Sequence, residues 1–297
     1  MDIRQLQYLS ALAREKHFSR AAAACHVTQP TLSERIRQLE EELGVAIVER
    51  GHKFHGLTAE GERVLKWAQV ILESCDAMRQ ELTAQRGDLS GRLTLGVIPS
   101  GLSVAANLMT ALRQSHPRLN ITVLSQTSEE IRHSLEDFSI DAGLTYLDNE
   151  PLDRVISQPL YQERYRLFMR HDHPLARRKQ VTWAEVAAEP LCLLTSNMQN
   201  RRIINGAFRG IGARVEPAIE SNSIINLCAN IRYGNLASVL PEAFIELFGK
   251  DSGLRAVPIV DPFITHIMGL VVLDRTPLPP ILNGLMAVAQ SLAAQDA

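Results

Sequence analysis

The stretch that decides the N-terminal fold is residues 18–44, which read FSRAAAACHVTQPTLSERIRQLEEELG. Small residues from Ala21 to Ala24 crowd the first part, which predicts a closely packed helix with Ser19 as its N-cap. A short turn is expected at Cys25–Val27, and a second helix follows it. This order predicts two helices joined by a tight turn.

The second helix has one apolar and one polar side. Thr28 is its expected N-cap, and Pro30 fits the first turn, where a missing N–H costs nothing. Intervals of four, three and four residues predict a buried stripe at Leu32, Ile36, Leu39 and Leu43. A small-residue helix that supports such a second helix is typical of a DNA-binding helix-turn-helix, and an ordinary helical hairpin is the alternative.

The polar side of the second helix carries groups that can read DNA. Gln29 can bond adenine at N6 and N7, and Glu34 can accept from cytosine N4. Thr31 and the neighbouring proline offer apolar contact to a thymine methyl group. Ser33 and Arg37 are expected to meet phosphate, with guanine as the alternative for Arg37. The predicted contacts in this helix are Gln29, Pro30, Thr31, Ser33, Glu34 and Arg37.

A small hairpin is expected directly after the second helix. Val45–Val48 suggests a short strand, Gly51–Gly56 a turn rich in Lys and His, and Leu57 the return. This hairpin would be a wing. Arg50 and Lys53 are predicted to lie where a phosphate backbone runs.

A long helix is predicted from its N-cap at Thr58 to about Gly87. Its apolar positions follow intervals of four and three: Val64, Ala68, Ile71, Cys75, Met78 and Leu82. We interpret this seam as a dimerisation helix, and a surface helix packed on its own domain is the alternative. Gly87 and Gly91 indicate a hinge after it.

The chain resembles the LysR-type transcriptional regulators over its full length. The matching segments are RQLQYLSALAREKHFSRAAAA, VTQPTLSERIRQLEEELG, the LT-x-x-G of Leu57–Gly61, GRLTLGVIPS, HPLA at His173–Ala176 and NLASVLP at Asn235–Pro241. The departures are Ile47-Val48 for the family's usual Leu-Phe, Cys25 for Leu, and Glu34 for a basic residue. The first two affect packing, and Glu34 bears on which DNA sequence is read.

From Gly91 onward, strands and helices alternate. Strand patterns occur around Leu93–Val97, Leu119–Leu124 and Asp141–Tyr146, with helices between them, which implies a parallel sheet. A second set begins at Arg164. We therefore predict two α/β lobes joined by crossing strands, similar to the effector domain of the family, which resembles a periplasmic binding protein.

The predicted fold class is α/β, with an N-terminal all-α winged helix-turn-helix domain and a two-lobed effector domain. The expected bounds are 1–58 for the DNA-binding domain, 59–90 for the linker helix and 91–297 for the effector domain. Lobe one takes about 91–163 and 268–297, and lobe two takes about 164–267.

Loops at the carboxyl ends of the strands are the expected place for a ligand. Hydroxyls and amides dominate them, and helix N-termini beside them suit an anion, although such residues are also ordinary N-caps. The predicted effector-binding residues are Ser100, Gly101, Thr127, Ser128, Thr145, Thr195, Ser196 and Asn197. Because these loops hold no Arg or Lys, helix ends and hydroxyls would supply most of the recognition of a small, anionic effector.

Composition bounds the function classes. The chain has 297 residues, a net charge of −2 and 45% hydrophobic residues, which suits two domains. No apolar run of roughly 18 residues and no signal peptide is evident, so we expect a cytoplasmic protein without a membrane span. Four cysteines at unrelated spacings favour buried reduced thiols over metal ligands, with a Cys192–Cys228 redox pair as the alternative.

Catalysis is not expected. His171 and His173 have no third metal ligand at a recognisable spacing, and no nucleophile elbow or phosphate loop is present. No cofactor or metal is predicted. We expect a regulator that binds double-stranded promoter DNA and a small-molecule effector. It would form a homodimer through the linker helix and, as the resemblance implies, a homotetramer. A small-molecule-binding module acting through protein contacts is the alternative, but it leaves Thr28–Lys53 unexplained.

Overall fold

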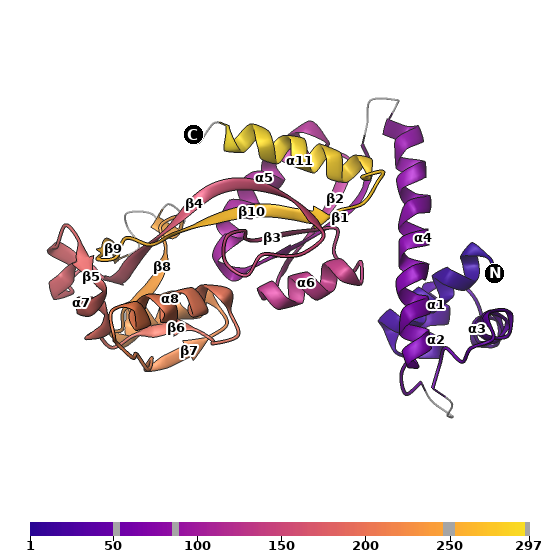
Figure 1. The fold of residues 1–297 in the computed structure, drawn as a ribbon, viewed down its shortest axis with the longest axis horizontal. Coiled ribbons are helices and arrows are strands. Elements are labelled where there is room, and N and C mark those ends of the chain that lie inside the picture. Colours follow the sequence, from indigo (N-terminus) through magenta and orange to yellow (C-terminus); the bar gives the residue numbers. More distant parts are fainter. Residues whose placement is uncertain (50–53, 85–88, 246–252, 295–297) are drawn as a thin grey trace. The chain divides into compact units, whose positions relative to one another are not determined.

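The structure is a computed structural model of the whole chain, and it describes residues 1–49, 54–84, 89–245 and 253–294. Two compact units follow one another along the chain, Met1–Asp88 and Leu89–Ala297. Figure 1 shows the N-terminal unit as helices and the C-terminal unit as a twisted sheet with helices around it.

The described part of the N-terminal unit holds four helices: α1 (Ile3–Glu15), α2 (Phe18–Ala24), α3 (Gln29–Leu43) and α4 (Ala59–Ala84). The predicted helix-turn-helix is α2, a turn and α3. The N-cap of α2 is His17, whose Nδ1 accepts from the backbone N–H of Ser19 at 3.2 Å. The prediction of Ser19 as this cap is therefore wrong, because Ser19 already lies in the first helical turn.

The apolar stripe of α3 is buried at three of its four predicted positions. Leu32, Ile36 and Leu39 are at most 2% exposed and pack in the core of this unit. Leu43 is 40% exposed, so its predicted burial is wrong. It is the last helical residue before Gly44, whose φ of 69° ends α3, and the core does not extend that far.

The start of α4 is fixed by close backbone contact with the segment after α3. Thr58 caps the helix by accepting from the N–H of Gly61 at 2.9 Å, as predicted, and its hydroxyl donates to Ala46 O at 2.6 Å. A Cβ on Gly61 would lie 2.1 Å from Ile47 O. The LT-x-x-G segment is thus a cap followed by a glycine that the backbone of Ile47 touches. Val48 and Leu57 form the antiparallel bridge of the hairpin.

The C-terminal unit holds a mixed sheet in the order β2-β1-β3-β10-β4-β9-β5, with β8 also paired to β4. Its strands are β1 (Gly91–Val97), β2 (Leu119–Ser125), β3 (Ala142–Tyr146), β4 (Val155–Arg170), β5 (Val181–Thr182), β8 (Ser238–Pro241), β9 (Leu254–Val260) and β10 (Thr265–Leu273). Strands β1, β2 and β3 are parallel, as predicted, and β10 runs antiparallel to β3. A separate pair is formed by β6 (Cys192–Leu194) and β7 (Ile219–Ser221).

Strand β4 joins two lobes. Its residues Val155–Arg164 pair with β10, and from Tyr165 to Arg170 it pairs with β8 and β9. Figure 1 shows β4 and β10 running from one lobe into the other. The helices are α5 (Leu102–Ser115), α6 (Ser128–Glu136), α7 (Trp183–Ala187), α8 (Gln199–Gly210), α9 (Ile224–Gly234) and α11 (Pro280–Ala293), with short 3₁₀ turns η1 (Pro99–Gly101) and η2 (Pro174–Arg177).

The described residues lack two features that would point to other functions. No helix in the described ranges is both long and apolar enough to cross a membrane. No group of three or more His, Cys, Asp or Glu side chains within the same ranges is arranged to hold a metal ion. His173 instead caps the turn η2, where its Nδ1 accepts from the N–H of Leu175 at 3.3 Å.

Candidate DNA-binding and effector sites

The N-terminal end of α3 presents an ordered polar surface. Thr28 Oγ1 accepts a hydrogen bond from the N–H of Thr31 at 3.4 Å and lies 2.8 Å from the Thr31 hydroxyl. The predicted N-cap of α3 is therefore confirmed. Gln29, Pro30 and Thr31 are exposed. Because the first turn is capped by a side chain of its own, these three residues lie on a rigid backbone, as recognition of base edges requires.

Farther along α3, charged side chains bond one another. Arg37 donates to Glu34 Oε1 at 2.7 Å and to Glu34 Oε2 at 3.0 Å, and it also donates to Glu41 at 2.5 Å. These bonds lower the pKa of Glu34. Both Glu34 and Arg37 are exposed, while Ser33 is half-buried. Contact with DNA would therefore require either charged residue to give up a partner in its own helix. Arg50 and Lys53 lie outside the described residues.

A cleft of about 1180 Å³ opens between the lobes of the C-terminal unit. Its walls combine apolar side chains with hydroxyls, amides and two carboxylates. Lobe one contributes Pro99, Leu102, Ser103, Ala106, Asn107, Ser125, Gln126, Thr127 and Glu130, and lobe two contributes Thr195, Asn197, Met198, Glu220, Ser221, Asn222, Ser223, Ile224, Ile225 and Phe244. A cleft with an apolar wall and several convergent polar groups is typical of a small-molecule site.

Three of the eight predicted effector residues line this cleft: Thr127, Thr195 and Asn197. Thr127 serves mainly as a cap, because it exchanges hydrogen bonds with Glu130 at the start of α6. The hydroxyl oxygen of Thr195 is buried and has no hydrogen-bond partner among the described residues, which leaves it available to a ligand or to water.

The other five residues do not line the cleft, so their prediction as lining residues is corrected. They are Ser100, Gly101, Ser128, Thr145 and Ser196. Ser100 and Thr145 are at most 2% exposed and bond other side chains behind the cleft wall. Gly101 is buried against Leu144 and Met268, and Ser196 is exposed beside the cleft. Being close to a strand end in sequence does not make a side chain face the space beyond it.

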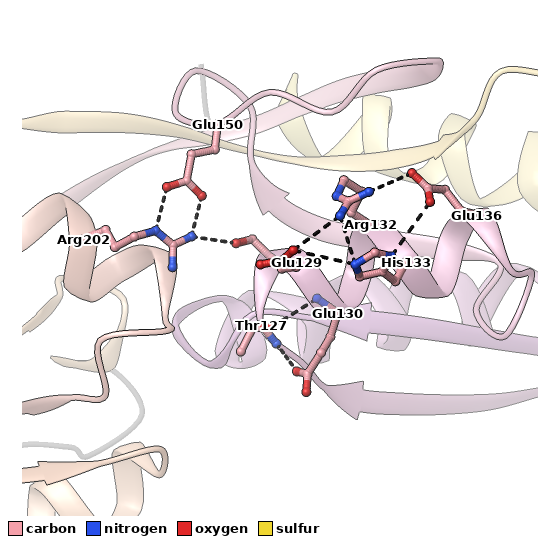
Figure 2. A network of polar contacts seen from close by, with 9 residues as sticks. Thr127, Glu129, Glu130, Arg132, His133, Glu136, Glu150 and Arg202 are labelled. Atoms are coloured by element: carbon pink, nitrogen blue, oxygen red, sulfur yellow. Dashed lines mark hydrogen bonds and ion pairs between the residues drawn. The ribbon is translucent and has the colours of Figure 1, made fainter.

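Ser128 instead takes part in a contact between the lobes. Arg202, on α8 of lobe two, donates to Ser128 Oγ at 3.1 Å and to Asn197 O at 2.7 Å. It also makes a two-pronged ion pair with Glu150 of lobe one, in which Nε donates to Oε1 at 2.6 Å. Figure 2 shows Arg202 and Glu150 facing each other beside α6. Sequence reasoning missed this arginine because it lies within a helix and not in a strand-end loop.

A second set of contacts between the lobes is buried around Tyr146. The Tyr146 hydroxyl donates to Glu163 Oε1 and lies 3.2 Å from Asn200 Nδ2 on α8, which donates to it. Tyr161 donates to the other carboxylate oxygen at 3.2 Å. Glu163 is 1% exposed, and burial raises its pKa to about 7, against the opposing effect of the tyrosine hydrogen bonds. No pattern in the sequence indicates this cluster.

The charges around the cleft do not favour an anion as strongly as predicted. None of its described lining residues is Arg or Lys, and Glu130 and Glu220 add negative charge. The neighbouring Arg201 already donates to Glu220 Oε1 at 2.6 Å and to Leu194 O at 2.7 Å. The start of α8 at Met198 has no side-chain cap and supplies about half a positive charge, which partly offsets the carboxylates.

A capped helix-turn-helix followed by a two-lobed unit with an interlobe cleft defines a class of DNA-binding regulators that respond to small molecules. The family model of the "Bacterial regulatory helix-turn-helix protein, lysR family" matches residues 3–62, and that of the "LysR substrate binding domain" matches residues 86–294. The chain belongs to the LysR family of transcriptional regulators.

Individual members are similar over nearly their whole length. The DNA-binding transcriptional dual regulator OxyR of Escherichia coli K12 is 31% identical over 279 residues, which cover 94% of this chain and 91% of that protein. A full-length OxyR variant from Pseudomonas aeruginosa superposes with a TM-score of 0.81 at 26% identity, covering 98% and 95% of the two chains. CbnR in complex with its target DNA shares the fold, with a TM-score of 0.70 at 22% identity and coverages of 98% and 100%.

Proposed function

We propose that the α3 helix of this regulator reads promoter DNA and that a small molecule in the interlobe cleft controls the result. The observation that carries the proposal is the joint presence of a capped helix with an exposed polar start and a separate cleft of about 1180 Å³. A ligand acts in such a protein only through its different affinities for two arrangements of the lobes.

Base recognition is assigned to the first turn of α3. Gln29 would bond adenine, and Thr31 with Pro30 would contact a thymine methyl group. Glu34 and Arg37 are proposed to contact DNA after exchanging their mutual ion pair, and Ser33 is proposed to meet phosphate. Contacts from Arg50 and Lys53 to phosphate remain part of the proposal on sequence grounds alone.

The effector is proposed to contact Thr127, Thr195 and Asn197 with its polar groups. Its apolar part would pack on Ile224, Phe244 and the neighbouring apolar side chains of the cleft. The anionic effector predicted from the sequence is not retained, since Glu130 and Glu220 line the cleft and Arg201 is already paired. A polar molecule with a low net charge fits this lining better.

Peroxide sensing is not proposed, although several relatives are named hydrogen peroxide-inducible genes activators. The thiolate is the reactive form of cysteine. Burial raises the pKa of Cys192 to about 11 and that of Cys228 to about 12, so both thiols stay protonated near neutral pH. Burial also raises the pKa of Cys25. These values support the prediction of buried reduced thiols at Cys192 and Cys228. Cys25 and Cys75 are half-buried, so the predicted burial of those two thiols is wrong.

Self-association is proposed through α4. The first half of its predicted seam packs in the core of the N-terminal unit, where Ala68 is 1% exposed. The second half is open, with Met78 at 58% and Leu82 at 63% exposure. An apolar seam that leaves its own core in this way favours pairing with a second copy of the helix. The homotetramer and the cytoplasmic location remain proposals that follow from the family resemblance and from the DNA partner.

The experiment is a comparison of Gln29→Ala with Gln7→Ala, a control that removes an exposed glutamine from α1. DNA selected by the wild-type protein is tested for binding at fixed salt against random DNA. Gln29→Ala is expected to lose about 1–3 kcal/mol on selected DNA and little on random DNA, the usual value of a bidentate base contact. Equal losses on both DNAs would refute the assignment. Failure of the wild type to select any DNA would favour a ligand-binding module that acts through protein contacts.

A further inference from the structure

The first turn of α8 is the place where lobe two contacts the buried side chains of lobe one. Gln199 accepts from the Thr145 hydroxyl at 3.2 Å and donates to Asn149, and Asn200 donates to Tyr146 at 3.2 Å. Gln199 and Asn200 are 2% and 3% exposed. Buried amides that bond across two lobes hold the lobes in one relative arrangement while those bonds last.

The same turn directly follows the loop that lines the effector cleft. Thr195, Asn197 and Met198 of the cleft wall precede Gln199 along the chain. A ligand that contacts this loop therefore lies within a few residues of the interlobe bonds. The loop and the turn together form a continuous path from the cleft to Tyr146.

A buried carboxylate without a cation stands behind Tyr146. Within the described residues, Glu163 bonds only tyrosine hydroxyls, and no Arg or Lys is paired with it. It lies on β4, one residue before the pairing of that strand with β10 ends. Burial without a cation favours the protonated form, and the raised pKa of about 7 agrees with this geometry.

Side chains from η1, β3, β4 and β10 surround Glu163 and its partner Tyr146. Tyr161 and Tyr165 share its strand, and the Tyr165 hydroxyl donates to that of Tyr146 at 3.3 Å. Ser100 of η1 lies 3.2 Å from the same hydroxyl. His266 of β10 is the register partner of Glu163, stacks edge-on against Tyr146 and bonds Asp148 at 3.2 Å. Among these, His266 and Asp148 are the other ionisable side chains beside the Tyr146–Glu163 pair.

We propose that Tyr146 and Glu163 position the cleft loop Thr195–Met198 through the first turn of α8, and that a proton on Glu163 stabilises the joined arrangement of the lobes. Loss of the proton places an unpaired charge behind Tyr146, which water can solvate only if the turn moves away from lobe one. The lobes are then less firmly joined. This proposal rests on the proposed function, because the cleft loop is assigned there to the effector.

The test is amide hydrogen exchange of the full-length protein, followed on peptides that cover 195–203 at pH 5.5 and pH 7.0. Rates are corrected for intrinsic chemistry by comparison with Glu163→Gln at each pH. Relative to Glu163→Gln, the exchange rate of these peptides in the wild type is expected to rise by as much as about tenfold from pH 5.5 to pH 7.0. The rise is expected because the contact between the lobes loses its proton in this window. An unchanged ratio would overturn the proposal.

Two further variants keep the test decisive if Glu163→Gln folds poorly. His266→Gln should retain the pH dependence of exchange. If this variant lost the pH dependence, the proton would belong to the histidine and the role of Glu163 would be overturned. Tyr161→Phe removes one donor to the carboxylate and should shift the midpoint to higher pH. Specific DNA binding is measured on the same samples. Its absence in the wild type would refute the proposed function and leave the exchange result standing.

Discussion

Gly61→Ala should destabilise the N-terminal unit because its new methyl group meets backbone. The added Cβ would lie 2.1 Å from Ile47 O and 2.9 Å from Ile47 C, far inside normal contact. To relieve this clash, α4 must move away from Ile47. The movement weakens the hydrogen bond that Thr58 donates to Ala46 O and the one that it accepts from the N–H of Gly61. Overpacking of this kind costs about 1–3 kcal/mol, and each weakened hydrogen bond adds about 1 kcal/mol.

Part of this loss is recovered, since alanine is favoured over glycine in a helix by up to about 1 kcal/mol. The net expectation is a loss of about 2 kcal/mol in the unfolding free energy of the unit. The matched control is Gly56→Ala, whose Cβ would meet only the Glu49 side chain at 3.4 Å. It should stay within about 0.5 kcal/mol of wild type.

Hydrogen exchange on peptides from α1 and α3, measured against urea concentration in the full-length chain, reports this free energy for the N-terminal unit alone. If Gly61→Ala proves as stable as Gly56→Ala, the backbone contact at Ile47 does not constrain the start of α4, and the explanation given for the LT-x-x-G segment fails.

Three further outcomes follow from other contacts. Burial raises the pKa of Glu163 from 4.5 to about 7, so folding takes up a proton between these pH values. The free energy of unfolding of the wild type should therefore fall by about 3 kcal/mol as pH rises from 4.5 to 7, and stay level above that. Urea titrations of Glu163→Gln should lack this fall, and the same pH dependence in both proteins would refute the prediction. Glu150→Gln removes the partly exposed ion pair to Arg202 and leaves the bonds of Arg202 to Ser128 and Asn197 in place, so calorimetry should show a loss of at most about 1 kcal/mol that vanishes at high salt; a loss that persists there would exclude an electrostatic origin. Glu40→Ala removes the carboxylate oxygen that accepts from the N–H groups of Ile47 and Val48, at 2.7 and 3.0 Å. The free energy of unfolding of the N-terminal unit, measured by hydrogen exchange against urea concentration, should fall by about 1–3 kcal/mol. An unchanged free energy would show that this contact does not stabilise the unit.

Local signals in the sequence predicted the helix-turn-helix well. The caps made by Thr28 and Thr58 and the helix-start position of Pro30 involve neighbours three residues away or fewer, so their patterns indicate the helix starts directly. The alternation around Leu93 and Leu95 likewise predicted a strand whose apolar side is fully buried. The error at Ser19 arose because histidine, with a ring nitrogen that can accept, took the capping position instead.

Long-range pairing explains what the sequence did not predict. In the first half of β4 and throughout β9, apolar and polar residues alternate only weakly along the sequence. The first half of β4 is a strand because it pairs with β10, and β9 is a strand because it pairs with the second half of β4. The same holds for the site. Glu150 meets Arg202 across 52 positions, and Tyr146 meets Asn200 across 54. No local spacing encodes such contacts, so Ser100 and Thr145 were predicted to line the cleft although they support its wall from behind.

This chain is expected to bind a specific DNA site in a manner that a small molecule changes. The most direct measurement is a footprint of the purified protein on genomic DNA, including the region upstream of its own gene, with and without a metabolite extract. A protected stretch of several helical turns that contains a dyad, and that changes length when the extract is added, is the predicted result. The absence of any preferred site at low salt, with and without extract, would contradict the account.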